Sequence, residues 1–283
     1  MWKYVLVSIS LVALLTGGPA RGDTTTSTTF VPCDPAKNYA LLWDDEFNNP
    51  GLPDPAKWGY ECGLLRNNEL QYYTKGRTNN ARVENGTLVI ETDKELYANA
   101  AYTSASLITF GKASFPVNTR VEVCAKLPFG SGIWPAIWMM GTDITNNHWC
   151  NWPQCGEIDI MEFMGCNPGV VSRSFHWMDL NSTNFLRTLN NVVVSDNTNA
   201  FHVYGVERTQ NSLKFFIDTN YYCTVTADST MASNLLSKPY YLLINTAFGG
   251  SAAGYVDDSI LPQKYYISWV RVFDMTSGPL PGP

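Results

Sequence analysis

Short strand-like runs follow one another along this chain, and no run with the period of a helix exceeds about three turns. Arg120 to Leu127 alternates apolar and polar residues and ends at Pro128, which predicts a half-covered strand. Ala81 to Glu91 predicts a hairpin, because an Asn85-Gly86 turn separates two β-rich runs. Many such runs in 283 residues favour an all-β fold of two antiparallel sheets packed face to face.

The densest chemical signal is the run from Gly156 to Phe163, in which three acids alternate with apolar residues. Side chains alternate between the faces of a strand, so Glu157 and Asp159 share one face and Glu162 has the wrong parity to join them. A β-bulge near Met161 would turn Glu162 back to the acidic face. An edge strand with three solvated acids is the alternative, but the apolar residues between the acids disfavour it.

Two carboxyl groups on one rigid support are what glycoside hydrolysis requires. One attacks the anomeric carbon and the other protonates the leaving oxygen, and a separation of about 5–5.5 Å leads to retention through a covalent intermediate. A third acid between them, as a like charge, drives the pKa values of its neighbours apart. The acidic strand therefore predicts a glycosidase.

Two motifs carry a resemblance to a known family: the acidic run, and the Trp134 to Trp138 run that precedes it. Together they resemble the active-site strands of glycoside hydrolase family 16, and the likeness extends from about Leu41 to Phe273. It implies a β-jelly-roll sandwich with a concave open cleft, and hence attack within a polymer. It also implies three catalytic residues: Glu157 as nucleophile, Glu162 as acid/base, and Asp159 as the acid that holds and tunes the nucleophile.

Six further residues are expected to contact the sugar. Indole faces stack on pyranose rings, which favours Trp134 and Trp138 as contacts, although burial of both in the core is the alternative. Between them, Pro135 cannot donate to a ladder, so we expect the strand to begin after it. The resemblance alone points to Asn68, and it places His176 in the cleft near the acids. Arg82 and Asn245 complete the expected set.

The segments around Asn68 and Trp134 look most like laminarinases, which cut β-1,3-glucans. Departures from that pattern are Ser106, Cys124 and Arg208, which replace a frequent Arg, Arg and Trp. Ser268 replaces an Asp that often binds structural calcium in the family, so we expect no calcium, no other metal and no cofactor. The expected function is a retaining endo-β-1,3-glucanase. The alternatives are a family member acting on mixed-linkage glucan or algal galactan, and a non-catalytic β-glucan recognition protein.

Charge limits the partners. A net charge of −6 argues against nucleic acid and anionic membranes, and is compatible with a neutral polysaccharide. We therefore expect a β-glucan polysaccharide as the partner of a monomeric protein.

The N-terminal residues predict secretion. Residues 1–22 read as a signal peptide, with Lys3 before an apolar run too short to span a membrane. We expect a flexible segment at 23–38, the catalytic domain at 39–275 and a tail at 276–283. Secretion permits disulfides, and among seven cysteines Cys150 and Cys155 are the first candidates for a pair. Asn85 and Asn181 are glycosylation acceptors in a eukaryotic secretory pathway.

Overall fold

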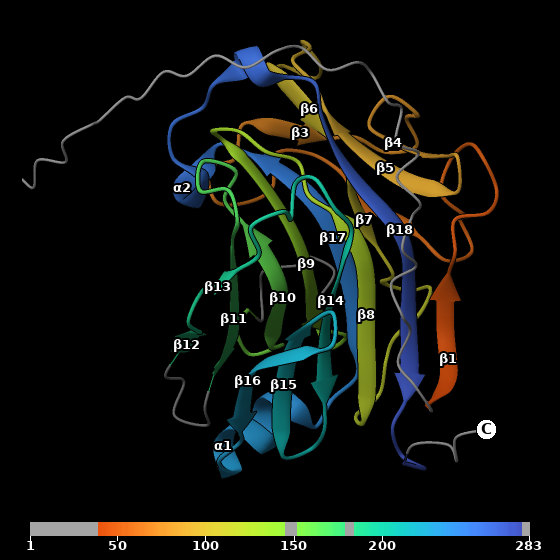
Figure 1. Ribbon diagram of the computed structural model, residues 1–283, viewed down its shortest axis with the longest axis vertical. Helices are drawn as coiled ribbons and strands as arrows, with labels where there is room; N and C mark the ends of the chain where they lie inside the picture. Colours follow the sequence, from red (N-terminus) through yellow and green to blue (C-terminus); the bar gives the residue numbers. More distant parts are fainter. Residues whose placement is uncertain (1–38, 145–151, 179–183, 279–283) are drawn as a thin grey trace, which may run out of the picture. The chain divides into compact units, whose positions relative to one another are not determined.

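The computed structural model describes residues 39–144, 152–178 and 184–278 (Figure 1). The expected signal peptide, the segment 23–38 and the acceptor Asn181 lie outside the described residues, as does most of the expected tail. Among the described residues, no helix is both long and apolar enough to cross a membrane.

Two sheets of eight strands make up the described chain, and every pairing within them is antiparallel. Sheet A has, in order, β16 (Asn220–Thr226), β15 (Ser212–Ile217), β14 (His202–Arg208), β8 (Thr119–Lys126), β18 (Gln263–Asp274), β5 (Thr87–Thr92) and β4 (Ala81–Glu84), with β1 (Ala40–Asp45) paired to β18. Sheet B has β12 (Asn184–Thr188), β11 (Val170–Met178), β10 (Glu157–Phe163), β9 (Ile133–Gly141), β17 (Tyr240–Phe248), β7 (Ser106–Ile108) and β2 (Gly59–Glu61), with β13 (Val192–Val193) paired to β11.

Smaller elements connect and flank the sheets. A parallel pair joins β3 (Gln71–Tyr73) and β6 (Tyr102–Ser104). The helical pieces are short: α1 (Ser229–Met231), the π-helix η1 (Ala232–Leu236), α2 (Gly250–Ala253) and the 3₁₀-helix η2 (Asp258–Ile260). The expected all-β class with two antiparallel sheets is therefore confirmed.

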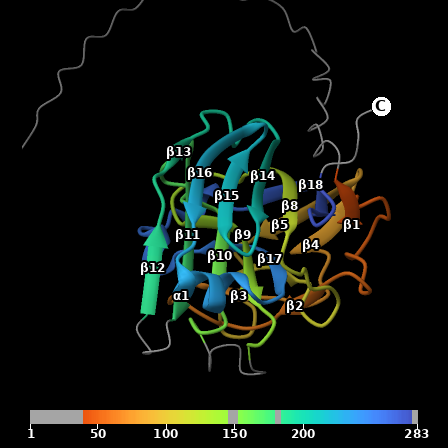
Figure 2. The same cartoon turned by 90° about the horizontal axis from the view of Figure 1, so that it is seen from below.

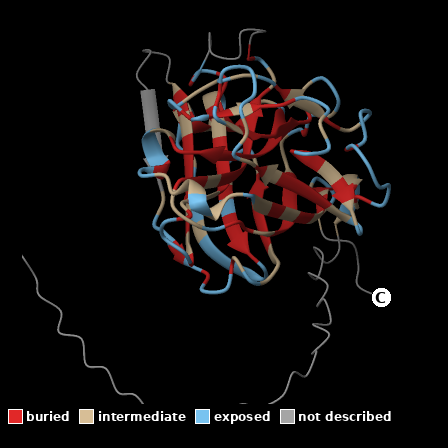
Figure 3. Ribbon diagram, turned by 90° about the horizontal axis from the view of Figure 1, so that it is seen from above, coloured by how far each residue is buried: buried red, intermediate tan, exposed pale blue. Residues whose placement is uncertain are grey.

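The main core lies between the two sheets. Figure 2 shows the strands of both sheets from below, and Figure 3 shows that many of their residues are buried. Sheet B contributes Ile158 and Phe163 of β10, and sheet A contributes Val123 of β8 and Val206 of β14, all of them buried. The inward side of β10 is thus apolar, which leaves its acids for the opposite side. That opposite side of sheet B carries a smaller apolar cluster that includes Trp138, Met140 and Tyr241.

Two local predictions can be compared directly with the backbone. The β4–β5 hairpin turns at Asn85 and Gly86, which have φ values of 53° and 70°, and Asn85 is exposed there. The expected start of a strand after Pro135 is wrong, because β9 already begins at Ile133. Pro135 pairs with Thr246 on β17, while the pairing of β9 with β10 ends at Ala136, so its missing N–H falls where β9 has a partner on one side only.

The expected pairing of Cys150 with Cys155 is also wrong. Cys155 is a free, buried thiol, and burial raises its pKa to about 12. Cys150 lies outside the described residues, and Cys62, Cys166 and Cys223 are free as well.

Candidate active site

A β-bulge in β10 brings the acids to one face of sheet B. The register with β11 shifts between Asp159, opposite Ser174, and Glu162, opposite Ser172. The register with β9 shifts between Asp159 and Met161. Ile160 and Met161 are consecutive and yet both are buried between the sheets, which is where the alternation slips by one residue. The predicted bulge near Met161 is confirmed.

Gly156 sets the entry into the acidic strand. Its φ is +75°, which favours glycine, and a Cβ atom there would lie 2.0 Å from the Tyr240 hydroxyl. That hydroxyl is itself fixed, because it donates to the Leu235 carbonyl over 2.8 Å. Only glycine allows the chain to pass Tyr240 and begin the strand at Glu157.

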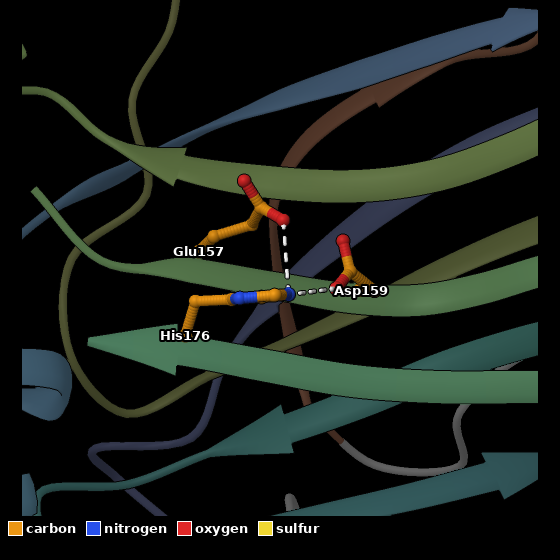
Figure 4. A group of neighbouring side chains, drawn as sticks. All are labelled: Glu157, Asp159 and His176. Atoms are coloured by element: carbon orange, nitrogen blue, oxygen red, sulfur yellow. Dashed lines mark ion pairs between the residues drawn. The ribbon is translucent and has the colours of Figure 1, made fainter. Parts of the chain in front are cut away.

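The three acids form one connected cluster with two residues of β11. Nε2 of His176 lies 3.4 Å from Oε1 of Glu157 and 3.6 Å from Oδ2 of Asp159, and dashed lines mark both ion pairs in Figure 4. Ser174 donates a hydrogen bond to Asp159, and its Oγ lies 3.4 Å from Oε2 of Glu162. The bulge thus places Glu162 beside the other two acids, facing the same side of the sheet.

Each of the two outer acids also accepts a hydrogen bond from an indole. Trp134 of β9 donates to Oε1 of Glu162 over 3.2 Å. Trp152, in the loop before β10, donates to Oε2 of Glu157 over 2.9 Å. Paired carboxyls with separate donors on a rigid strand are the arrangement that hydrolysis of a glycosidic bond needs.

Comparison with known proteins bears on this geometry. A sequence model described as Glycosyl hydrolases family 16 matches residues 68–271. The chain belongs to glycosyl hydrolases family 16.

Individual family 16 relatives agree with this assignment. The Beta-glucanase of Rhodothermus marinus is 39% identical over 250 residues, which are 85% of this chain and 87% of that protein. The Glucan endo-1,3-beta-glucosidase A1 of Niallia circulans is 34% identical over 273 residues, which are 86% of this chain and 39% of that longer protein. The X-ray structure of the laminarinase from Rhodothermus marinus superposes with a TM-score of 0.74 at 38% identity, covering 85% of this chain and 99% of that one. The protein is a glycoside hydrolase, and its packed sheets are the expected β-jelly roll.

Burial governs the protonation of the family 16 acids. It raises the pKa of Glu157 to about 8, with the nearby Asp159 charge adding to the effect. Burial also raises the pKa of Asp159 well above its usual range, and it raises that of Glu162. Three carboxyls this close cannot all be ionised at neutral pH, so the cluster holds at least one proton.

The same cluster has the spacing of a cation site. Glu157, Asp159 and His176 each offer one donor atom, all within 4.8 Å of one another. However, Glu157 already accepts from Trp152, and Asp159 already accepts from Ser174. Both carboxylates thus have partners within the chain, and the absence of a metal requirement stays a prediction.

The structure places Trp138 next to the acids and Asn245 beside Trp138, and it buries both. Trp138 lies directly opposite Asp159, is 6% exposed and donates to Oδ1 of Asn245 over 2.8 Å. Asn245, 5% exposed, donates to the Tyr73 hydroxyl over 2.9 Å. These residues support the floor beside the acids, and the alternative of a core role describes Trp138 better.

Arg82 is not brought to the acids. It lies on β4 of sheet A, where its guanidinium pairs with Glu84 and Glu91 and donates to the carbonyls of Thr78 and Asn79. The expectation that Arg82 contacts the sugar does not fit this placement. The sequence could not reveal this, since an alternating strand pattern does not show which sheet a strand joins.

Asn68 is exposed with φ 54°, next to Glu69, which pairs with Gly249 at the end of β17.

Sequence reasoning missed four residues on or beside the acid face of sheet B. Trp152 holds Glu157, and no local pattern marked it because its role depends on how the loop folds back. Glu61 accepts from Ser106 over 2.6 Å and pairs with Arg66, whose guanidinium lies 5.0 Å from the Trp138 ring. Ser174 was missed as well, although its position opposite Asp159 follows once the register of β11 is known.

Proposed function

We propose that this protein is a retaining endo-β-1,3-glucanase that hydrolyses internal bonds of laminarin-type glucans. The observation that carries the proposal is the bulged β10, which gathers Glu157, Asp159 and Glu162 on one face, with a separate indole donor for each of the two outer acids. Two of the relatives, a glucan endo-1,3-beta-glucosidase and a laminarinase, support the choice of linkage.

The proposed reaction has two steps. Glu157 attacks the anomeric carbon while Glu162 gives its proton to the glycosidic oxygen, so the C–O bond breaks and a glycosyl ester forms on Glu157. Glu162, now ionised, takes a proton from water, and the resulting hydroxide attacks the same carbon and releases Glu157. Two inversions give net retention. Asp159 and His176 adjust the charge around Glu157 between the steps.

A non-catalytic glucan-binding role is the alternative from another class. All three acids are present and connected in this structure, and a protein that only binds glucan has no need of a buried, proton-sharing carboxyl cluster. A hydrolase of mixed-linkage glucan or algal galactan would use the same acids, so only the products distinguish it.

Product analysis tests the proposal. Purified protein is incubated with laminarin, a mixed-linkage glucan and an algal galactan, and the products are separated by size. We expect a ladder of β-1,3-oligosaccharides from laminarin, with the β-anomer formed first by ¹H NMR. Glu157→Gln and Glu162→Gln should each abolish the ladder without altering the circular dichroism spectrum. Absence of new reducing ends on every substrate would exclude hydrolysis.

Secretion is part of the same proposal and rests on residues 1–22 of the sequence. Expression of the full chain in a secreting host should release protein into the medium with an N-terminus near Asp23. Retention of the protein in the cells with Met1 intact would count against it.

A further inference from the structure

The two outer acids are each held by one tryptophan, and these two hydrogen bonds differ in kind. Trp134 lies on β9, next to the strand of Glu162, and its indole N–H is 3.2 Å from Oε1. Trp152 lies in a loop, and its indole N–H is 2.9 Å from Oε2 of Glu157. The loop tryptophan thus makes the shorter contact, although its backbone belongs to no strand.

Trp152 does not need Glu157 in order to satisfy its own N–H group. The side chain is 38% exposed, so water could accept from the indole. The Glu157 carboxylate gains a direct donor from this contact, because Trp152 donates to Oε2 while the other oxygen, Oε1, faces His176 at 3.4 Å. The Trp152 ring also packs against the His176 ring, with centroids 5.4 Å apart at 48°. Trp152 and His176 therefore hold Glu157 from the loop and from the neighbouring strand.

We propose that Trp152 is a positioning residue for the nucleophile: its indole N–H fixes Oε2 of Glu157 and favours the ionised carboxylate that attacks the sugar. The inference rests on the proposed function, since it takes Glu157 as the nucleophile. Trp134 makes the corresponding contact to Glu162, the acid/base, and serves as the internal comparison.

The indole N–H of Trp152 is a neutral donor, and its effect depends on the titratable groups around Glu157. These groups are Asp159 and Glu162 on the same strand, His176 on β11, Tyr240 and Tyr241 on β17, and Cys155 in the preceding loop. The residues of β9 nearest to it, Met140 and Trp138, carry no charge. Burial and Asp159 raise the pKa of Glu157, whereas the hydrogen bond from Trp152 lowers it. Removal of the indole N–H should leave a carboxyl that is harder to ionise.

Substitution of the two tryptophans should then shift opposite limbs of the pH profile of kcat/KM. Ionisation of the nucleophile sets the acidic limb of kcat/KM, and deprotonation of the acid/base sets the alkaline limb. Loss of a hydrogen bond to a charged group corresponds to a shift of about one pH unit. Trp152→Phe keeps an aromatic ring and removes the donor, so the acidic limb should move up by about one unit while the alkaline limb stays. Trp134→Phe should move the alkaline limb up and leave the acidic limb in place.

The experiment measures kcat/KM on a soluble laminari-oligosaccharide from pH 4 to 9 for the wild type, Trp152→Phe and Trp134→Phe. An acidic limb of Trp152→Phe within 0.2 units of wild type would overturn the inference. If Trp152→Phe does not fold, Trp152→Leu is measured in its place with the same expectation.

Titration of ¹³C-labelled glutamate carboxyls by NMR, with Glu157→Gln to assign the signal, supplies the same comparison without turnover. An upward shift of the Glu157 titration in Trp152→Phe supports the effect of the indole on this carboxyl even if no glucan is cleaved. In that case the proposed function fails, and the role of Glu157 as nucleophile fails with it. An unshifted titration overturns the inference, whatever the activity.

Discussion

Ser174 joins Asp159 to Glu162 across the bulge of β10. Its hydroxyl donates to Asp159, and its oxygen lies 3.4 Å from Oε2 of Glu162. A single side chain from β11 therefore connects the acid before the extra residue with the acid after it. The alignment of the two carboxyls depends on this contact as well as on the backbone.

Ser174→Ala should lower kcat about 10-fold with less than a two-fold change in KM, because a hydrogen bond to a charged group is lost at the reacting centre. Ser172→Ala is the matched control, since Ser172 lies on the same strand and donates to the backbone carbonyl of Glu162 over 3.2 Å, not to its carboxyl, within the described part of the chain. Initial rates on laminarin separate the two variants. Equal losses in both would show that the Ser174 side chain has no special role.

Glu157→Gln should stabilise the fold more as the pH rises. The folded-state pKa of Glu157, about 8, lies above its usual value of 4.5, so the folded state holds this proton more tightly than the unfolded state. The stability from the bound proton is complete below about pH 4.5 and is lost as the pH rises through about 8. We expect a melting temperature equal to wild type at pH 4 and several degrees higher at pH 8. Thermal unfolding followed at both pH values checks this expectation. A difference in melting temperature between the variant and the wild type that does not change with pH would contradict it.

Gly156→Ala should destabilise the protein by more than about 2 kcal/mol, since it combines an unfavourable positive φ with a clash against the fixed Tyr240 hydroxyl. Gly86→Ala is the matched control: its φ is also positive, at +70°, but a Cβ there would meet nothing within 4 Å. That variant should lose only about 1 kcal/mol. Denaturant unfolding compares the two, and similar losses would mean that Tyr240 moves aside freely.

Arg82→Ala should leave kcat/KM on laminarin within two-fold of wild type. Its guanidinium is paired with Glu84 and Glu91 on sheet A, away from the acid cluster. The cost should appear in unfolding, at about 1 kcal/mol for partly exposed ion pairs. A rise in KM with unchanged stability would instead indicate that Arg82 contacts the sugar.

The acidic strand could be predicted from sequence because parity is a local property. Glu157 and Asp159 share a face by spacing alone, and the mismatch at Glu162 required either a bulge or a buried charge. Trp152 could not be found in this way, since its contact with Glu157 depends on the path of a loop. Trp138 shows a second limit: spacing gives its face, which it shares with the acids, but not the Arg66 and Asn245 side chains that cover it.

The proposed catalytic role of β10 depends on the number of its residues as well as on their chemistry. Insertion of one apolar residue between Met161 and Glu162 would remove no acid, no donor and no aromatic ring. Regular alternation after the bulge would nevertheless turn Glu162 toward the apolar layer between the sheets and leave Glu157 where it is, so the proposed proton donor would be lost through a change of length in one strand.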